Sequence, residues 1–223
     1  MSIISHKNFE AFSAYKNKYI NKQCCIFGTG QSLLRYNIIP NTVNIGCNRC
    51  IFYKDLIFDF YFFNDLARTT AEYRNHILSY TPKIKKFFGS FINDKHLGCS
   101  KDFAESGNAI LYDMEGPGGG TFQKEIDKYC VGDKGQSIVF VEMQFALFCG
   151  FTTIYIIGCD IDNLKNKDKY FYNADYIKNY TWYSPLKQNW IHIKNFISKN
   201  YPNVKIVSVN PMGLKNIFID MYQ

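Results

Sequence analysis

QCCIFGTGQS, residues 23–32, is an apolar run that ends abruptly in a Gly-x-Gly-x-Ser turn. A strand that leads into such a turn is typical of the first strand-helix unit of nucleotide-binding α/β domains. Glycines allow backbone amides to approach a phosphate, and the Ser32 hydroxyl adds a hydrogen-bond donor. The turn is neither a complete dinucleotide fingerprint nor a P-loop, which argues against NAD-type and ATPase-type sites. A tight strand-to-helix connection that binds nothing is the alternative interpretation.

Strands and helices alternate along the rest of the chain. Short apolar or alternating runs predict strands at 23–27, 43–47, 58–62, 84–88, 153–157 and 204–209. Periodic segments predict helices at 7–19, 66–79, 137–149 and 185–200. This order predicts one Rossmann-like α/β domain over residues 1–223, with a mostly parallel sheet covered on both faces. Residues 93–134, with a Gly-Pro-Gly-Gly-Gly run at 116–120, break the rhythm and predict a loop-rich insertion or lid.

The charge pattern narrows the classes of partner. The chain of 223 residues has a formal net charge of +7, and its basic residues are scattered apart from two lysine clusters. We interpret these clusters as solvated surface; they are Lys83, Lys85 and Lys86, and Lys165, Lys167 and Lys169. Because the chain has no long basic arm, we expect no nucleic-acid partner.

Signals for export and membrane insertion are not evident. Residues 1–22 lack the pattern of a secretory signal, and the most apolar region, 137–158, is interrupted by polar residues and glycine. We therefore expect a cytoplasmic protein, with association at the inner face of the membrane and a homo-oligomer left open. Eight cysteines in such a chain predict reduced thiols. Cys47 and Cys50 form a lone CxxC without the second ligand pair of a zinc site.

Polar residues follow several predicted strands at the point where each one ends. Asn48 and Asn64 come after the second and third strands, and Ser137 precedes an apolar helix as its expected N-cap. The carboxyl ends of parallel strands form the ligand crevice of an open sheet. We therefore expect these three residues to converge with the Gly28–Ser32 turn on one nucleotide, although each asparagine also fits a helix cap.

Two carboxylates follow the strand at 153–157. Asp160-x-Asp162 resembles the DxD element of metal-dependent glycosyltransferases, in which carboxylates hold a divalent ion against the donor diphosphate. A Mg²⁺ or Mn²⁺ ion at Asp160 and Asp162 is therefore the alternative to a reaction without metal.

Taken in sequence, these markers resemble the small bacterial sialyltransferases that use a CMP-activated donor, and the related Rossmann-type domain of 6-hydroxymethylpterin diphosphokinase-like proteins. The matching segments are 24–64 and 137–218. The resemblance implies that the nucleotide contacts seven residues, namely Gly28, Gly30, Gln31, Ser32, Asn48, Asn64 and Ser137, with Asp160 beside them. It also places Tyr170 near a family tyrosine that supports the leaving phosphate.

The catalytic base is where the chain departs from this family. The sialyltransferases place a histidine shortly before the helix that precedes the last strand, whereas this chain has Tyr183, Ser184 and Pro185 there. His192 lies about two turns later, inside the helix, and a structural histidine is an equal interpretation. We rank His192 ahead of Asp162 as base because an imidazole titrates near neutral pH. His96 is third.

The function we predict is inverting transfer of a sialic-acid-like sugar from a CMP-activated donor to a glycan acceptor, in surface polysaccharide or lipopolysaccharide synthesis. The reaction needs a base for the acceptor hydroxyl and donors for the departing phosphate, for which Tyr170 is the candidate. No metal cofactor is expected. The alternatives are a metal-dependent nucleotide-diphosphate-sugar transferase, a pterin diphosphokinase-like enzyme and a catalytically silent nucleotide-binding module.

Overall fold

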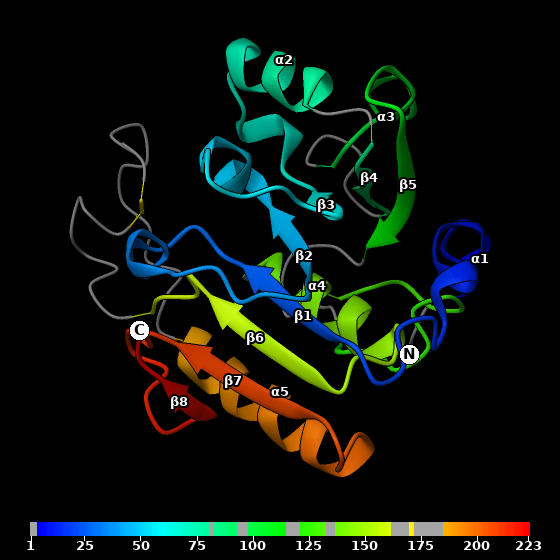
Figure 1. The fold of residues 1–223 in the computed structure, drawn as a ribbon. Coiled ribbons are helices and arrows are strands. Elements are labelled where there is room, and N and C mark those ends of the chain that lie inside the picture. Colours follow the sequence, from blue (N-terminus) through cyan, green and yellow to red (C-terminus); the bar gives the residue numbers. More distant parts are fainter. Residues whose placement is uncertain are drawn as a thin grey trace.

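The described chain forms one parallel β-sheet with helices on both faces. A computed structural model describes residues 4–80, 83–92, 98–114, 121–132, 137–161, 170–171 and 185–223. Within them, eight strands lie in the order β5-β4-β3-β2-β1-β6-β7-β8 (Figure 1). Their bounds are β1 (Gln23–Phe27), β2 (Thr42–Cys47), β3 (Phe60–Phe63), β4 (Lys85–Phe91), β5 (Ala109–Met114), β6 (Thr153–Ile157), β7 (Lys205–Val209) and β8 (Ile219–Met221). Every pair of neighbouring strands is parallel.

Two apolar layers cover the sheet. One face packs against α1 (His6–Phe12), α4 (Val139–Phe148) and α5 (Leu186–Asn200). The other face packs against α2 (Ala71–Ser79), α3 (Lys101–Ser106) and the short 3₁₀ helices η2 (Gln31–Arg35) and η3 (Asn48–Phe52). Figure 1 shows α4 and α5 behind β1, β6 and β7. All ten residues of α4 are buried, which explains why its sequence is apolar on every side.

The strand order creates a switch point between β1 and β6. From β1 the chain adds β2, β3, β4 and β5 in one direction, and it then returns to place β6, β7 and β8 on the other side of β1. The connections after β1 and β6 therefore leave in opposite directions from the carboxyl ends of these two strands. Ligands of open α/β sheets bind at such a point.

The predicted fold class is confirmed, and six of the strands lie within two or three residues of their expected bounds. The loop-rich interpretation of 93–134 is wrong for part of its length, because α3 and the edge strand β5 lie inside it. Strand β8 was also not predicted. Both missed strands are at sheet edges. Strand β8 has only three residues, whereas β5 has six, mostly apolar ones, and it was missed because the glycine-rich run at 116–120 led us to interpret the whole of 93–134 as loop.

Two smaller expectations also change. The helix expected at 7–19 ends at Phe12 and continues only as a 3₁₀ turn, before Asn17 takes a left-handed backbone with φ 54°. Lys86 is not solvated surface: it is buried, and its ammonium donates to the carbonyls of Ile77 and Leu78 at the end of α2. Lys83 is exposed, and the second lysine cluster lies outside the described residues.

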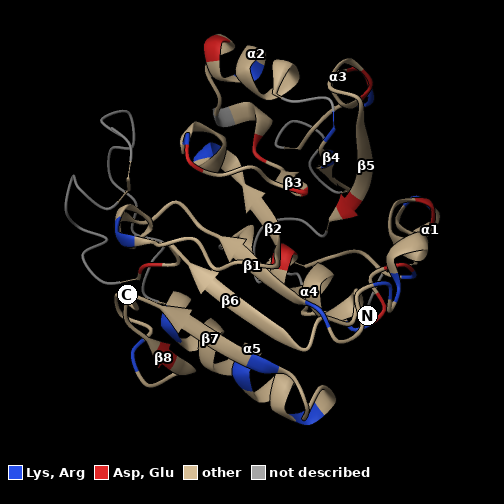
Figure 2. Ribbon diagram, in the orientation of Figure 1, with Lys and Arg blue, Asp and Glu red and all other residues tan. Residues whose placement is uncertain are grey.

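Charged residues are scattered over the helices and loops, whereas the central strands β1, β2 and β6 carry none (Figure 2). The outer side of α5 carries exposed lysines at 187, 194 and 199. All eight cysteines are free thiols, as predicted. In the described part of the chain, no helix combines the length and the apolar character needed to cross a bilayer.

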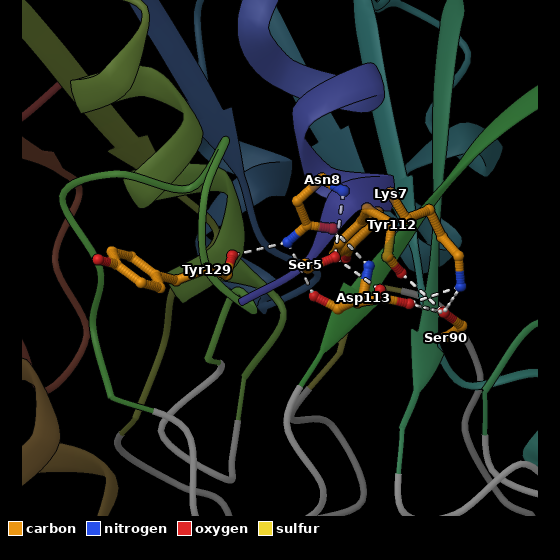
Figure 3. A network of polar contacts seen from close by, with 7 residues as sticks. All are labelled: Ser5, Lys7, Asn8, Ser90, Tyr112, Asp113 and Tyr129. Atoms are coloured by element: carbon orange, nitrogen blue, oxygen red, sulfur yellow. Dashed lines mark hydrogen bonds and ion pairs between the residues drawn. The ribbon is translucent and has the colours of Figure 1, made fainter. Parts of the chain in front are cut away.

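A polar network holds α1 against the edge strand β5 (Figure 3). The Asn8 side chain pairs with the backbone of Asp113 like a neighbouring strand, because its oxygen accepts from the Asp113 amide at 2.6 Å and its nitrogen donates to the Asp113 carbonyl at 3.1 Å. The Asp113 carboxylate accepts from Lys7 at 2.6 Å, from Ser5 at 2.6 Å and from Ser90 at 2.9 Å. The edge of β5 is thus covered at this position.

Candidate functional site

Two glycine turns interlock at the switch point. The amide of Gly28, after β1, donates to the Ile157 carbonyl at 2.8 Å, and the amide of Gly30 donates to the Gly158 carbonyl at 2.7 Å. A Cβ atom on Gly28 would lie 2.4 Å from the Gly158 carbonyl oxygen, so no larger residue fits there. Gly158 has φ +64°, a backbone that favours glycine. The glycines of both turns are therefore required for the approach of one turn to the other.

Asp160 closes this junction. Its carboxylate accepts the Ser32 amide at 2.8 Å and the Ser32 hydroxyl at 2.5 Å, across 128 residues of sequence. A Cβ atom on Gly30 would lie 2.5 Å from the carboxyl carbon of Asp160. The amides of Gly28, Gly30 and Ser32 thus donate to protein acceptors, and these residues are buried. The partly exposed members of the turn are Thr29 and Gln31.

The segment 170–171 lies against the same turn. Tyr170 forms an antiparallel bridge with Gly30, and the Phe171 amide donates to the Thr29 carbonyl at 3.1 Å. The Phe171 ring packs edge-on against Tyr53, with 5.8 Å between ring centroids. The structure therefore places Tyr170 beside the turn, and its role towards a leaving phosphate stays a prediction.

Asn48 and Asn64 lie at the carboxyl edge of the sheet, as predicted. Cys47 of β2 pairs with Phe62 of β3, so that both asparagines directly follow neighbouring strands. Asn48 has a left-handed backbone with φ 48°, and its carbonyl accepts from the Tyr61 hydroxyl at 2.8 Å. It therefore begins η3 with a conformation that asparagine tolerates well.

The side chain of Asn64 is buried and rests on two residues that the sequence did not single out. Its amide nitrogen donates to the Met114 sulfur at 3.4 Å. A Cβ atom on Gly89 would lie 2.9 Å from the Asn64 Cβ and 2.5 Å from the Met114 sulfur, so Gly89 leaves the room that both need. A thioether is a weak acceptor. The amide of Asn64 is therefore held in place without a strong partner at that contact.

Of the remaining predicted site residues, Ser137 and His192 lie in different parts of the fold, and two others lie outside the described residues. Helix α4 packs on β1 and β2 and leads into β6, so its first turn and Ser137 lie at the carboxyl edge. The N-cap of α4 is Ile138, not Ser137, because the helix begins one residue later than expected. His192 lies midway along α5 on its exposed side and contacts Gln188 at 3.3 Å, one turn earlier. Asp162 and His96 lie outside the described residues.

A buried group of thiols lies beneath the glycine turn. Cys47 donates to the Phe27 carbonyl at 3.3 Å, and Cys50 donates to the same oxygen at 3.1 Å. Glu142 of α4 is fully buried nearby, and burial, followed by the charge of Cys50, raises the pKa of its carboxyl well above the usual range. Burial likewise raises the pKa of the Cys47 thiol. The raised pKa values favour the protonated forms of Glu142 and Cys47, which are typical of structural groups and not of a reactive thiolate centre.

Metal ligands do not gather in the described part of the chain. No group of three or more histidine, cysteine, aspartate or glutamate side chains there has the arrangement to hold a metal ion. Both oxygens of Asp160 already accept from Ser32. The second carboxylate of the DxD-like pair, Asp162, is outside the described residues, so the metal alternative stays a prediction.

Solved structures that match the fold of this chain include two sialyltransferases. The monofunctional α-2,3-sialyltransferase Cst-I from Campylobacter jejuni is 18% identical with a TM-score of 0.52, over 84% of this chain and 75% of that one. The sialyltransferase CstII from the same organism, solved with the substrate analogue CMP-3FNeuAc, is 19% identical with a TM-score of 0.52, over 90% and 86%. The chain shares their fold. Comparison with protein-family models and with curated sequences gave no match.

Proposed function

We propose that this protein is a glycosyltransferase that takes a sialic-acid-like sugar from a CMP-activated donor. The observation that supports this most strongly is the interlocked turn of Gly28–Ser32 at the switch point of a sheet whose fold is shared with sialyltransferases. The acceptor is a glycan, in the synthesis of surface polysaccharide or lipopolysaccharide. The cytoplasmic location predicted from the sequence remains part of the proposal.

The nucleotide occupies the carboxyl edge of β1, β2 and β3 in this proposal. Gln31 meets it from the outward side of the turn, while Gly28, Gly30 and Ser32 support that turn from within. Asn48 and Asn64 contact it from the next two strands, and Asn64 exchanges its thioether partner for a stronger ligand acceptor. Ser137 approaches it from the amino end of α4.

Tyr170 supports the leaving phosphate. Its bridge to Gly30 keeps the residue beside the turn, and a phenol can donate a hydrogen bond to the oxygen on which charge develops as CMP departs. A monophosphate leaving group carries less charge than a diphosphate. The reaction therefore proceeds without a divalent ion in this proposal, and a direct displacement inverts the sugar centre.

The proposed reaction is tested by CMP release from CMP-N-acetylneuraminic acid in the presence of mixed glycan acceptors, with and without excess EDTA. We expect turnover to be unchanged by EDTA, because both carboxylate oxygens of Asp160 already accept from Ser32 and a monophosphate leaving group has less charge to neutralise than a diphosphate. Loss of turnover in EDTA that manganese restores would instead assign a metal to Asp160 and Asp162.

The base is tested separately, because the structure weakens the case for His192. Its ring lies on the solvent side of α5, about 9 Å of helix rise beyond the first residue. We expect His192→Asn to retain turnover within about threefold, whereas a true base loses about 100-fold or more. A loss of that size with CMP binding retained would identify His192 as the base; retention leaves Asp162 and then His96.

Two other functions are separated by one screen of thermal stability with CMP-, UDP- and GDP-sugars and with ATP plus magnesium. A ligand that binds only the folded state raises its stability by mass action. Stabilisation by ATP with magnesium, and not by CMP-sugars, would favour a pterin diphosphokinase-like enzyme. Stabilisation by CMP-sugars without turnover on any acceptor would favour a silent binding module.

A further inference from the structure

We propose that Asp160 is a positioning residue that shapes the nucleotide-binding turn, and that its carboxylate takes the Ser32 donors that a phosphate would otherwise use. This inference rests on the proposed function and deepens it. It assigns to Asp160 a contact with the protein and not with a donor phosphate or a metal.

The geometry of the junction carries the inference. Asp160 follows β6, and Ser32 lies in the first turn of η2 after β1, so the two hydrogen bonds join the segments that follow the strands on either side of the switch point. Ser32 is 1% exposed, so removal of the Asp160 carboxylate takes away the acceptor that satisfies its buried amide and hydroxyl. The turn would then have to rearrange to satisfy these donors.

The packing of Gly30 gives a second, independent observation. The carboxyl group of Asp160 fills the space where a side chain at position 30 would lie, with its Oδ2 atom 2.5 Å from an added Cβ. Gly30 in turn carries the bridge to Tyr170. Asp160 therefore determines where the backbone of Gly30 lies. The positions of Gln31, the next residue, and of Tyr170, which pairs with Gly30, depend on it.

The charge of Asp160 argues against a phosphate at this point of the turn. A carboxylate that accepts from both Ser32 donors presents negative charge to any anion placed against them, and the two like charges repel. The phosphate is expected on the side of Tyr170. The effect of Asp160 on donor binding is thus one of shape, and loss of its charge alone should not weaken binding.

The test compares Asp160→Asn with Asp160→Ala. Asparagine is isosteric: its oxygen can accept the Ser32 amide, and its nitrogen can donate to the Ser32 hydroxyl oxygen after that hydroxyl rotates. Alanine offers neither contact. Asn8→Ala is the control, because it removes several buried hydrogen bonds at the far edge of the sheet. For each variant, hydrogen exchange of residues 28–32 without ligand and calorimetric titration with CMP are measured.

We expect Asp160→Ala to speed exchange in residues 28–32 and to weaken CMP binding by at least about tenfold, as misplaced binding groups do. Asp160→Asn should bind CMP within about threefold of the unmodified protein, and Asn8→Ala should do the same despite a lower melting temperature. If Asp160→Ala does not fold, Ser32→Ala, which keeps the amide contact, should show the same pattern at a smaller size.

Three results would overturn the inference, and they are distinguishable. Faster exchange with unchanged CMP affinity in Asp160→Ala shows that the shape of the turn does not govern binding, while the proposed function stands. If Asp160→Asn weakens CMP binding as much as Asp160→Ala does, the negative charge of Asp160 is itself required, as it would be if Asp160 bound a metal ion. No CMP binding by the unmodified protein removes the proposed function and this inference together.

Discussion

At the scale of single residues, Glu142 shows how a buried acid affects stability without taking part in the proposed chemistry. Neither of its carboxyl oxygens has a hydrogen bond in the described part of the chain. Burial, and then the charge of Cys50, holds its pKa well above the usual range. At pH values between the unfolded and the folded pKa, the folded protein therefore keeps a proton that the unfolded chain has lost. Stability from this group is therefore greatest at low pH and decreases as pH rises above the unfolded pKa.

We predict that Glu142→Met raises the free energy of unfolding at pH 8 by about 1–3 kcal/mol, because a methionine of similar length has no polar oxygens to bury. The gain should be smaller at pH 5, where the unfolded carboxyl is closer to its own pKa. Urea unfolding at both pH values measures the difference. An equal or larger gain at pH 5, or a loss at pH 8, would contradict the assigned protonation.

At the scale of elements, the contact of α1 with β5 depends on one carboxylate. Burial alone would raise the pKa of Asp113, but hydrogen bonds from Lys7, Ser5 and Ser90 outweigh it and lower that pKa. The folded protein thus favours the ionised form. Its stability contribution is present above the unfolded pKa and is lost as pH falls below it towards the folded pKa.

We predict that Asp113→Asn lowers the free energy of unfolding at pH 7 by about 1–3 kcal/mol, the range for hydrogen bonds to charged groups. The difference should shrink below about pH 4, where the unfolded carboxyl becomes protonated. Glu125→Gln is the control, because its partner Lys128 is also on the surface and such pairs contribute little. A difference that persists unchanged at pH 2 would contradict the role of ionised Asp113.

The elements also show what the sequence could predict. Central strands such as β1 and β6 are continuous apolar runs, and the glycines that follow them identify the carboxyl edge directly. Edge strand β5 is only partly buried at four of its six residues, and its helix α1 comes from a distant part of the chain. That pairing depends on the Asn8 side chain, and no local pattern indicates it.

The candidate site likewise contains residues that the sequence could identify and contacts that it could not. Residues that follow strands, Asn48, Asn64 and Asp160, could be found from their positions alone. Their partners could not: the Ser32 to Asp160 contact spans 128 residues, and the support of Asn64 by Met114 requires β5 to be known. Local sequence also suggested that the glycine amides face a phosphate, whereas the amides of Gly28 and Gly30 donate to the turn after β6.

At the scale of the whole molecule, the strand order explains why residues from both halves of the chain lie at the same carboxyl edge of the sheet. Strands β1 to β5 carry Gly28, Asn48 and Asn64, while β6 and the segment after it carry Asp160 and Tyr170. The two sets meet only because β6 returns beside β1. The proposed function therefore depends on one property above all, the binding of a cytidine nucleotide at this meeting point.

Calorimetric titration with CMP, UMP and GMP tests that property most directly, on the unmodified protein, on Gly30→Ala and on Gly107→Ala. A methyl group at position 30 collides with Asp160, whereas one at position 107 meets only the Phe88 and Leu78 side chains beside α3. We predict that CMP binds most tightly, that Gly30→Ala weakens it by at least about tenfold, or about 1.4 kcal/mol, and that Gly107→Ala leaves it unchanged. Equal binding of CMP by a folded Gly30→Ala variant, or no preference for CMP in the unmodified protein, would contradict the account.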